Sequence, residues 1–208
     1  MKHNSRLALA LVGALMVTAP TANATEEPRW TSVAQEGAFE VRDYAPTVVA
    51  ETVVDGERGA AINQGFRRLA GYIFGGNQPA QESAMTAPVA QQPAGRRIAM
   101  TSPVAQMPAP NGWMVTFYMP PGSRLDDMPR PNDATVELRQ QPQRRVAVGR
   151  FSGLATQSNL SRHADELLSY VRARGDTVLG PVTYAFYDPP WTLPWARRNE
   201  VMVEIAVR

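Results

Sequence analysis

Few side chains in this sequence could serve as a nucleophile, a general base or a metal ligand. The 208 residues include two His, a single lysine at position 2, and no Cys. The absence of Cys excludes thiolate catalysis and cysteine-ligated zinc or iron–sulfur sites. His163 has Ser161 and Asp165 near it in the sequence, but a spacing of two residues places these side chains on other faces of a helix. The sequence therefore argues against a hydrolase triad, and we expect the protein not to be an enzyme.

The first 24 residues have the pattern of a secretory signal peptide. Lys2 and Arg6 precede an apolar run over residues 7–17, and residues 22–24 (Ala-Asn-Ala) form an A-x-A cleavage pattern. The apolar run is far shorter than the ~20 residues that span a bilayer. We therefore expect a periplasmic or secreted protein with no stable membrane anchor after cleavage.

Cleavage of residues 1–24 would change the charge and the chemistry of the chain. Loss of Lys2 and Arg6 from the 21 basic residues leaves 19, which equals the number of acidic residues. A neutral chain lacks the basic surface that nucleic-acid binding requires, so we expect no nucleic-acid partner. The remaining chain would have no lysine, which excludes P-loop and pyridoxal chemistry. Its one histidine excludes a multi-histidine metal site.

Hydrophobic periodicity predicts strands and two helices after a polar lead-in over residues 25–38. The helix expected over residues 56–74 has one apolar stripe, formed by Ile62, Phe66, Leu69 and Ile73. The helix expected over residues 159–174 has a similar stripe, formed by Leu160, Ala164, Leu167 and Val171. Strands are expected over residues 39–43, 47–54, 113–119, 136–139, 180–187 and 199–207. On the last strand, Glu200 and Glu204 share the face opposite the apolar one, which we expect to be solvated and partnered by Arg.

The sequence repeats itself at two scales. Residues 84–91 and 99–106 are identical at seven of eight positions, and we expect the two copies to pair as a hairpin. At the larger scale, the order strand, strand, helix, strands occurs in two pseudo-repeats, over about residues 39–119 and 134–208. Two such halves can join their strands into one curved sheet or barrel, with a helix from each half against it. The sequence thus predicts an α+β fold with internal pseudo-two-fold symmetry.

Several segments resemble the SOUL heme-binding protein family, in particular its bacterial exported members. They are residues 39–46 (FEVRDYAP), residues 65–77 (GFRRLAGYIFGGN), the two Met-Thr-x-Pro-Val copies, residues 145–153 (RVAVGRFSG) and residues 197–201 (RRNEV). The resemblance covers residues 39–208 and implies one domain with a distorted antiparallel β-barrel and two helices. It also implies binding of heme or a related tetrapyrrole without catalysis, and no metal other than the heme iron.

Heme is a flat apolar plate with two carboxylates at one edge, so its site needs an apolar groove and donors such as Arg for the propionates. The resemblance implies contacts around the first helix, with Phe66 as the leading candidate. The expected contacts are Asn63, Phe66, Arg67, Leu69, Tyr72 and Ile73. The alternative is that the apolar stripe of this helix simply packs on the sheet.

His163 is the candidate axial ligand of the heme iron, and the alternative is a partly buried His163 paired with Glu166. The sequence lacks the histidine near the N-terminal strands that some members of the family are thought to use. Other members are thought to bind heme through apolar burial, without an axial ligand from the protein. We therefore predict weak or moderate binding without a strong ligand field.

Two other binding functions remain open at this point. The same groove could bind a different apolar ligand that carries a carboxylate. The Pro-rich aromatic loop over residues 191–195 could instead dock a protein partner of unknown identity.

Overall fold

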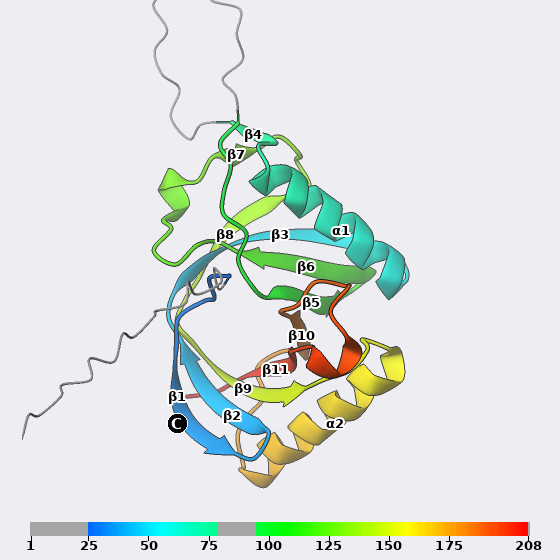
Figure 1. The fold of residues 1–208 in the computed structure, drawn as a ribbon. Coiled ribbons are helices and arrows are strands. Elements are labelled where there is room, and N and C mark those ends of the chain that lie inside the picture. The colour runs from blue at the N-terminus through cyan, green and yellow to red at the C-terminus, as the bar shows by residue number, and fades with distance from the viewer. Residues whose placement is uncertain (1–24, 79–94, 208) are drawn as a thin grey trace, which may run out of the picture.

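The computed structural model of the chain describes residues 25–78 and 95–207. Figure 1 shows a large antiparallel sheet that curls into a half-barrel, with two helices packed against it. The predicted α+β class with a distorted barrel is confirmed. The helices are α1 (Arg58–Ile73) and α2 (Gln157–Ala173).

The large sheet has nine strands. They are β1 (Trp30–Glu36), β2 (Phe39–Tyr44), β3 (Thr47–Asp55), β5 (Val104–Ala109), β6 (Gly112–Tyr118), β8 (Glu137–Gln141), β9 (Arg144–Phe151), β10 (Thr183–Phe186) and β11 (Asn199–Ile205). The short strands β4 (Asn77–Gln78) and β7 (Arg130–Pro131) pair separately. Two 3-10 turns, η1 (Leu125–Asp127) and η2 (Pro194–Ala196), lie in the loops.

The strand order explains how the two halves of the sequence form one unit. The sheet runs β1-β2-β9-β11-β10-β5-β6-β3-β8, so that β10 and β5 meet at its centre. The first strand of each half pairs with the second strand of the other half: β2 pairs with β9, and β8 pairs with β3. Each half therefore completes the sheet of the other, and the strands of both halves form one continuous sheet.

Each helix covers one half of the sheet. α1 packs on β3 and β6, and α2 packs on β9 and β11 (Figure 1). The predicted stripe of α2 is confirmed, because the buried residues of this helix are Leu160, Ala164, Leu167 and Val171. Among the described residues, no helix combines the length and apolar character that crossing a membrane requires.

The stripe that α1 turns to the sheet differs from the predicted one. Its buried residues are Ala61, Gly65, Leu69, Tyr72 and Ile73, whereas Phe66 is exposed and Ile62 is only partly buried. The reason is close packing at Gly65: a Cβ built there would lie 2.6 Å from Cγ2 of Val115. Small residues let α1 sit low on β6, and the helix is rotated so that Phe66 lies at the edge of the contact.

Substitution of Gly65 provides a test of this close approach. We expect Gly65→Ala to lower the free energy of unfolding by about 1–3 kcal/mol, because overpacking forces the helix away from Val115. Gly71, in the same helix, has no atom within 4 Å of a Cβ built on it. Gly71→Ala should therefore raise stability by about 0.5–1 kcal/mol through helix propensity. Urea denaturation of both variants measures the contrast, and equal effects would contradict the close packing.

Two segments differ from the sequence-based expectation. Residues 25–38, expected as a polar lead-in, include β1, which pairs along the whole of β2. β1 is an exposed edge strand, so it has no apolar and polar alternation that would predict it. The expected hairpin between residues 84–91 and 99–106 was wrong for residues 104–106, which pair with β6 and β10 because a tight turn brings β6 directly beside them. The first copy lies outside the described residues.

Candidate functional site

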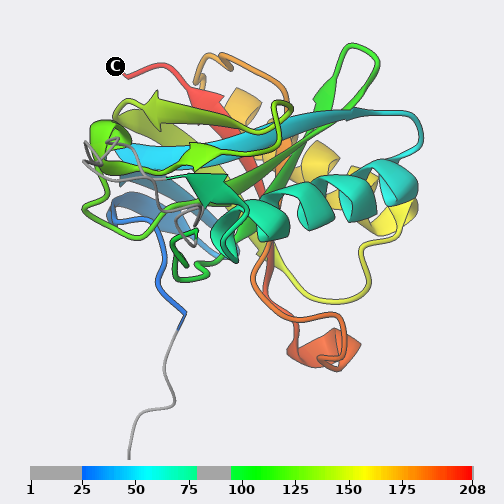
Figure 2. The same ribbon diagram turned by 90° about the horizontal axis from the view of Figure 1, so that it is seen from above.

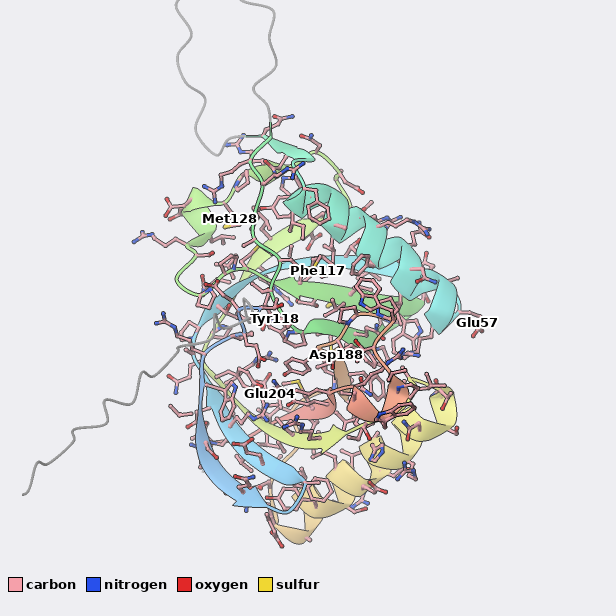
Figure 3. The ribbon with its side chains drawn as sticks, viewed as in Figure 1. Glu57, Phe117, Tyr118, Met128, Asp188 and Glu204 are labelled. Carbon is pink, nitrogen blue, oxygen red and sulfur yellow. The ribbon has the colours of Figure 1, made fainter. Side chains whose placement is uncertain are left out.

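The outer face of α1 carries three of the six predicted heme contacts. Asn63, Phe66 and Arg67 are all exposed, and Phe66 has 38% of its surface in contact with solvent. The Phe66 ring stands edge-on against Phe117, with the ring centroids 5.3 Å apart and the planes at 68°. Figure 3 places Phe117 on the sheet beside α1. This face of α1 therefore presents the ring of Phe66, which is supported by Phe117 of the sheet. The side-chain amide of Asn63 and the guanidinium of Arg67 lie within one helical turn of it.

The other three predicted contacts lie in the core. Leu69, Tyr72 and Ile73 are 0%, 2% and 1% exposed. The Tyr72 hydroxyl donates to the carbonyl of Pro129 at 3.0 Å, and burial raises the pKa of Tyr72 to about 12. These three side chains fix α1 to the sheet and present no surface to a ligand in this structure.

Further apolar surface near α1 was missed in the sequence analysis. Phe74, directly after the helix, is 57% exposed, and Met100 is 42% exposed. Met100 belongs to a segment that passes the end of α1, where the amide of Ile98 donates to the carbonyl of Ile73 at 2.8 Å. Arg96 and Arg97 begin this segment and are exposed. Local sequence patterns could not predict that this segment lies beside the end of α1, because the contact joins residues that are far apart in the chain.

We use the name α1 face for the exposed side chains on α1 and in the segment that passes its C-terminal end. They are Asn63, Phe66 and Arg67 on the helix, Phe74 directly after it, and Arg96, Arg97 and Met100 in the segment. Arg68, which follows Arg67, is not part of it, because its guanidinium bonds to Thr52 and the carbonyl of Val53 on β3. The α1 face combines exposed apolar side chains with three exposed guanidinium groups, which is the chemistry that an apolar plate with carboxylates requires.

His163 lies on α2 and is not part of the α1 face. Both of its ring nitrogens are engaged: the Arg162 guanidinium lies 2.9 Å from Nε2, and Glu166 Oε2 lies 2.9 Å from Nδ1. A guanidinium can only donate, so Nε2 accepts from Arg162 and Nδ1 carries the proton that is donated to Glu166. The ring also stacks on Phe151 at 4.3 Å. Ligation of an iron by His163 would thus require the Arg162 bond to break.

An open groove lies between α2 and the turn that joins β1 to β2. Its volume is about 1120 Å³, slightly above the ~300–1,000 Å³ of most small-molecule sites. One wall is the stacked pair Phe39 and Tyr170, whose ring centroids are 4.7 Å apart. However, three carboxylates, Glu36, Asp165 and Glu166, line this groove against one guanidinium. This groove would repel the propionates of a heme, and so its charge makes it a poorer candidate than the α1 face.

The inner face of the sheet, opposite the helices, holds a buried ionic network centred on Glu200. This side chain is 0% exposed. Its carboxylate accepts hydrogen bonds from Arg42 (3.0 and 3.2 Å), from Arg198 (3.0 and 3.2 Å) and from the Tyr187 hydroxyl (2.6 Å). Burial alone would raise the pKa of Glu200, but the bonds and charge of Arg42, with Tyr187 and Arg198, lower it. The network ties β2 to β11 and is satisfied internally, which indicates a structural role.

The space inside the curve of the sheet is too small for a macrocycle. A cavity of about 80 Å³ lies there, lined in part by Tyr118, Arg144 and Glu204. Figure 3 shows Tyr118 and Glu204 within this curve. Small-molecule pockets usually have volumes of ~300–1,000 Å³. A tetrapyrrole does not fit this cavity. Within the described part of the chain, no group of three or more His, Cys, Asp or Glu side chains could hold a metal ion.

Comparison with known proteins agrees with this architecture. The SOUL heme-binding protein family matches residues 25–204. The chain is 28% identical over 184 residues to heme-binding protein 2 of Mus musculus, an alignment that covers 86% of this chain and 85% of that protein. The C-terminal domain of EcmrR has a similar fold, with a TM-score of 0.58, 9% identity, and coverage of 82% of this chain and 98% of that domain. A hydrolase from Listeria innocua has a TM-score of 0.50 at 8% identity, with coverage of 84% and 94%. At such identities these two structures establish a likeness of fold alone. The match over most of the chain shows that this protein belongs to the SOUL heme-binding protein family.

Proposed function

We propose that the protein is an exported binding protein for heme or a related tetrapyrrole, and that it does not catalyse a reaction. In this proposal residues 1–24 are a signal peptide, and the mature chain begins at residue 25 in the periplasm or outside the cell. The name of the relative, heme-binding protein 2, and the family match support the class of ligand. The leader pattern supports export.

The observation that carries the choice of site is the exposure of Phe66 on the α1 face. A tetrapyrrole laid on this face would cover the ring of Phe66, with Phe74 and Met100 as further apolar contacts. Burial of such surface stabilises binding by about 25 cal/mol per Å² of apolar area. Arg67 from the helix, and Arg96 from the neighbouring segment, would meet the propionates at the edge of the plate.

Coordination of the iron by the protein is not needed for this mode of binding. α1 contains no His, Cys or Met. His163 has both nitrogens engaged on the other helix. A bound heme would supply the iron and its redox chemistry, while the chain would hold the ring by apolar burial and charge. We therefore assign no axial role to His163, although it is the only histidine after the leader.

Titration of the mature chain with hemin, followed by its visible absorption, tests the proposal. We expect saturation at one equivalent with a red-shifted Soret band. Binding at many weak sites would contradict a dedicated tetrapyrrole site and would favour another apolar ligand that carries a carboxylate. A catalogue of small molecules that copurify with the protein, obtained by mass spectrometry, would then identify that ligand.

The role of His163 is tested in the same assay. We expect the His163→Ala variant to show the wild-type Soret band and an affinity within about twofold, because the side chain lies away from the α1 face. Loss or shift of the band in a variant that remains folded by circular dichroism would instead identify His163 as the axial ligand.

A further inference from the structure

The loop between β10 and β11 carries the most exposed aromatic side chains among the described residues. Trp191 is 81% exposed, Trp195 is 73% exposed, and Leu193 between them is 56% exposed. Figure 2 shows this loop, with η2 at its end, projecting from the body of the molecule. Single exposed apolar residues are common, but two tryptophans and a leucine within five residues form a patch that calls for an explanation.

The loop is held in one shape by its own hydrogen bonds. Arg197 donates through Nε to the carbonyl of Thr192 at 2.8 Å and through the end of its guanidinium to the carbonyl of Pro190. The amide of Gly153 donates to the carbonyl of Pro194 at 2.9 Å and ties the loop to the chain before α2. The side chains are therefore presented by a preorganised scaffold, which lowers the entropy lost when they bind.

The patch is apolar and carries no free charge from its own segment. Leu154, next to Gly153, is 51% exposed and extends the patch beyond the loop. Residues 189–199 contain no acidic side chain, and their two arginines are both engaged. Arg197 bonds to carbonyls of the loop, and Arg198 turns inward to Glu200. We call Leu154, Trp191, Leu193 and Trp195 the apolar tip.

We propose that the apolar tip docks the protein reversibly on a lipid bilayer by inserting into its interfacial region. Tryptophan is enriched at membrane interfaces, where its indole is partly apolar and its N–H stays near water. The tip projects and presents only four side chains, whereas a stable protein interface takes about 20–30 residues from each partner. A mature chain of zero net charge points to apolar insertion and not to attraction by anionic lipids.

Vesicle binding tests the proposal with the mature chain. We expect cosedimentation with phosphatidylcholine vesicles and with phosphatidylcholine–phosphatidylglycerol vesicles, a blue shift of the tryptophan emission, and little change on addition of salt. Each of Trp191→Ala and Trp195→Ala should lower the partition coefficient about tenfold, because each removes an indole from the interface. Leu179→Ala is the matched control: Leu179 is 58% exposed, and its amide bonds to Glu204 near the other end of β11. This variant should bind like the wild type.

Three results would overturn the proposal. The first is failure of the wild type to bind either kind of vesicle, which would leave a protein partner as the occupant of the tip. The second is binding only to the anionic vesicles with loss at high salt. The third is full binding by the Trp191→Ala/Trp195→Ala double variant. Hemin titration of the double variant separates the two proposals, since the tip lies outside the α1 face and the variant should bind hemin normally.

Discussion

We expect the Glu200→Gln variant to lose about 3–5 kcal/mol of the free energy of unfolding. The substitution keeps the shape of the side chain but replaces one acceptor oxygen by an amide that can only donate. Arg42, which is 5% exposed, then keeps only Glu40 as a carboxylate partner. Arg198 likewise keeps only Glu27. Removing one partner of a buried ionic network lowers stability strongly, because the remaining charges stay buried with fewer partners. Replacing the whole network by apolar residues of similar volume would cost much less.

Urea denaturation measures this loss, and Glu204→Gln is the matched control on the same strand. Glu204 is only partly buried, so we expect its variant to remain within about 0.5 kcal/mol of the wild type. A Glu200→Gln variant as stable as the control would contradict the buried network. Retention of the cooperative transition shows that the variant still folds and that the measured difference is meaningful.

The network also predicts how stability depends on pH. The folded-state pKa of Glu200 is lowered from its ordinary value of 4.5, so its contribution is complete above that pH and is lost as the pH falls through the folded pKa. Asp43, bonded to Arg145, acts in the same direction because its pKa is also lowered. We therefore expect the wild type to lose stability below about pH 4.5 and Glu200→Gln to lose less over the same range. Parallel curves for the two proteins would show that Glu200 is not the titrating group.

Phe66→Glu should weaken hemin binding by at least about 100-fold. The substitution removes the apolar ring that the macrocycle would cover and places a carboxylate where it must be desolvated beside the propionates. Because Phe66 is 38% exposed, the change should cost the fold little. Phe66→Leu, which keeps an apolar side chain, should weaken binding by no more than about tenfold.

A substitution on α2 tests whether hemin binds in the acidic groove and not on the α1 face. Asp165→Asn alters the acidic groove beside that helix and leaves the α1 face intact. We expect its hemin affinity to equal that of the wild type. Wild-type affinity in a folded Phe66→Glu protein, measured by the same titration, would rule out the α1 face as the site.

The sequence predicted the class of fold and the two helices because these depend on local periodicity. The stripe of α2 was predicted correctly, since each of its four apolar residues is buried. The stripe of α1 was only partly correct, because the close approach permitted by Gly65 rotates the helix on β6. As a consequence, two of the predicted heme contacts on this helix differ in exposure: Phe66 is exposed, whereas Leu69 is buried against the sheet.

Features that depend on distant parts of the chain could not be predicted. Glu200 alternates with apolar residues on β11 and was expected on a solvated face, but the curl of the sheet encloses that face. Its partner Arg42 is 158 residues away in the sequence. The segment that carries Met100 likewise passes the end of α1 only because the chain returns there, with the amide of Ile98 bonded to the carbonyl of Ile73.

The most direct test of the tetrapyrrole site is to map contacts by two-dimensional amide NMR of the mature chain as zinc protoporphyrin is added. We expect the shifted amides to concentrate at Asn63, Phe66 and Arg67 on α1, together with those near Met100. Shifts confined to residues 36–39 and 162–173, around the acidic groove, would contradict this expectation.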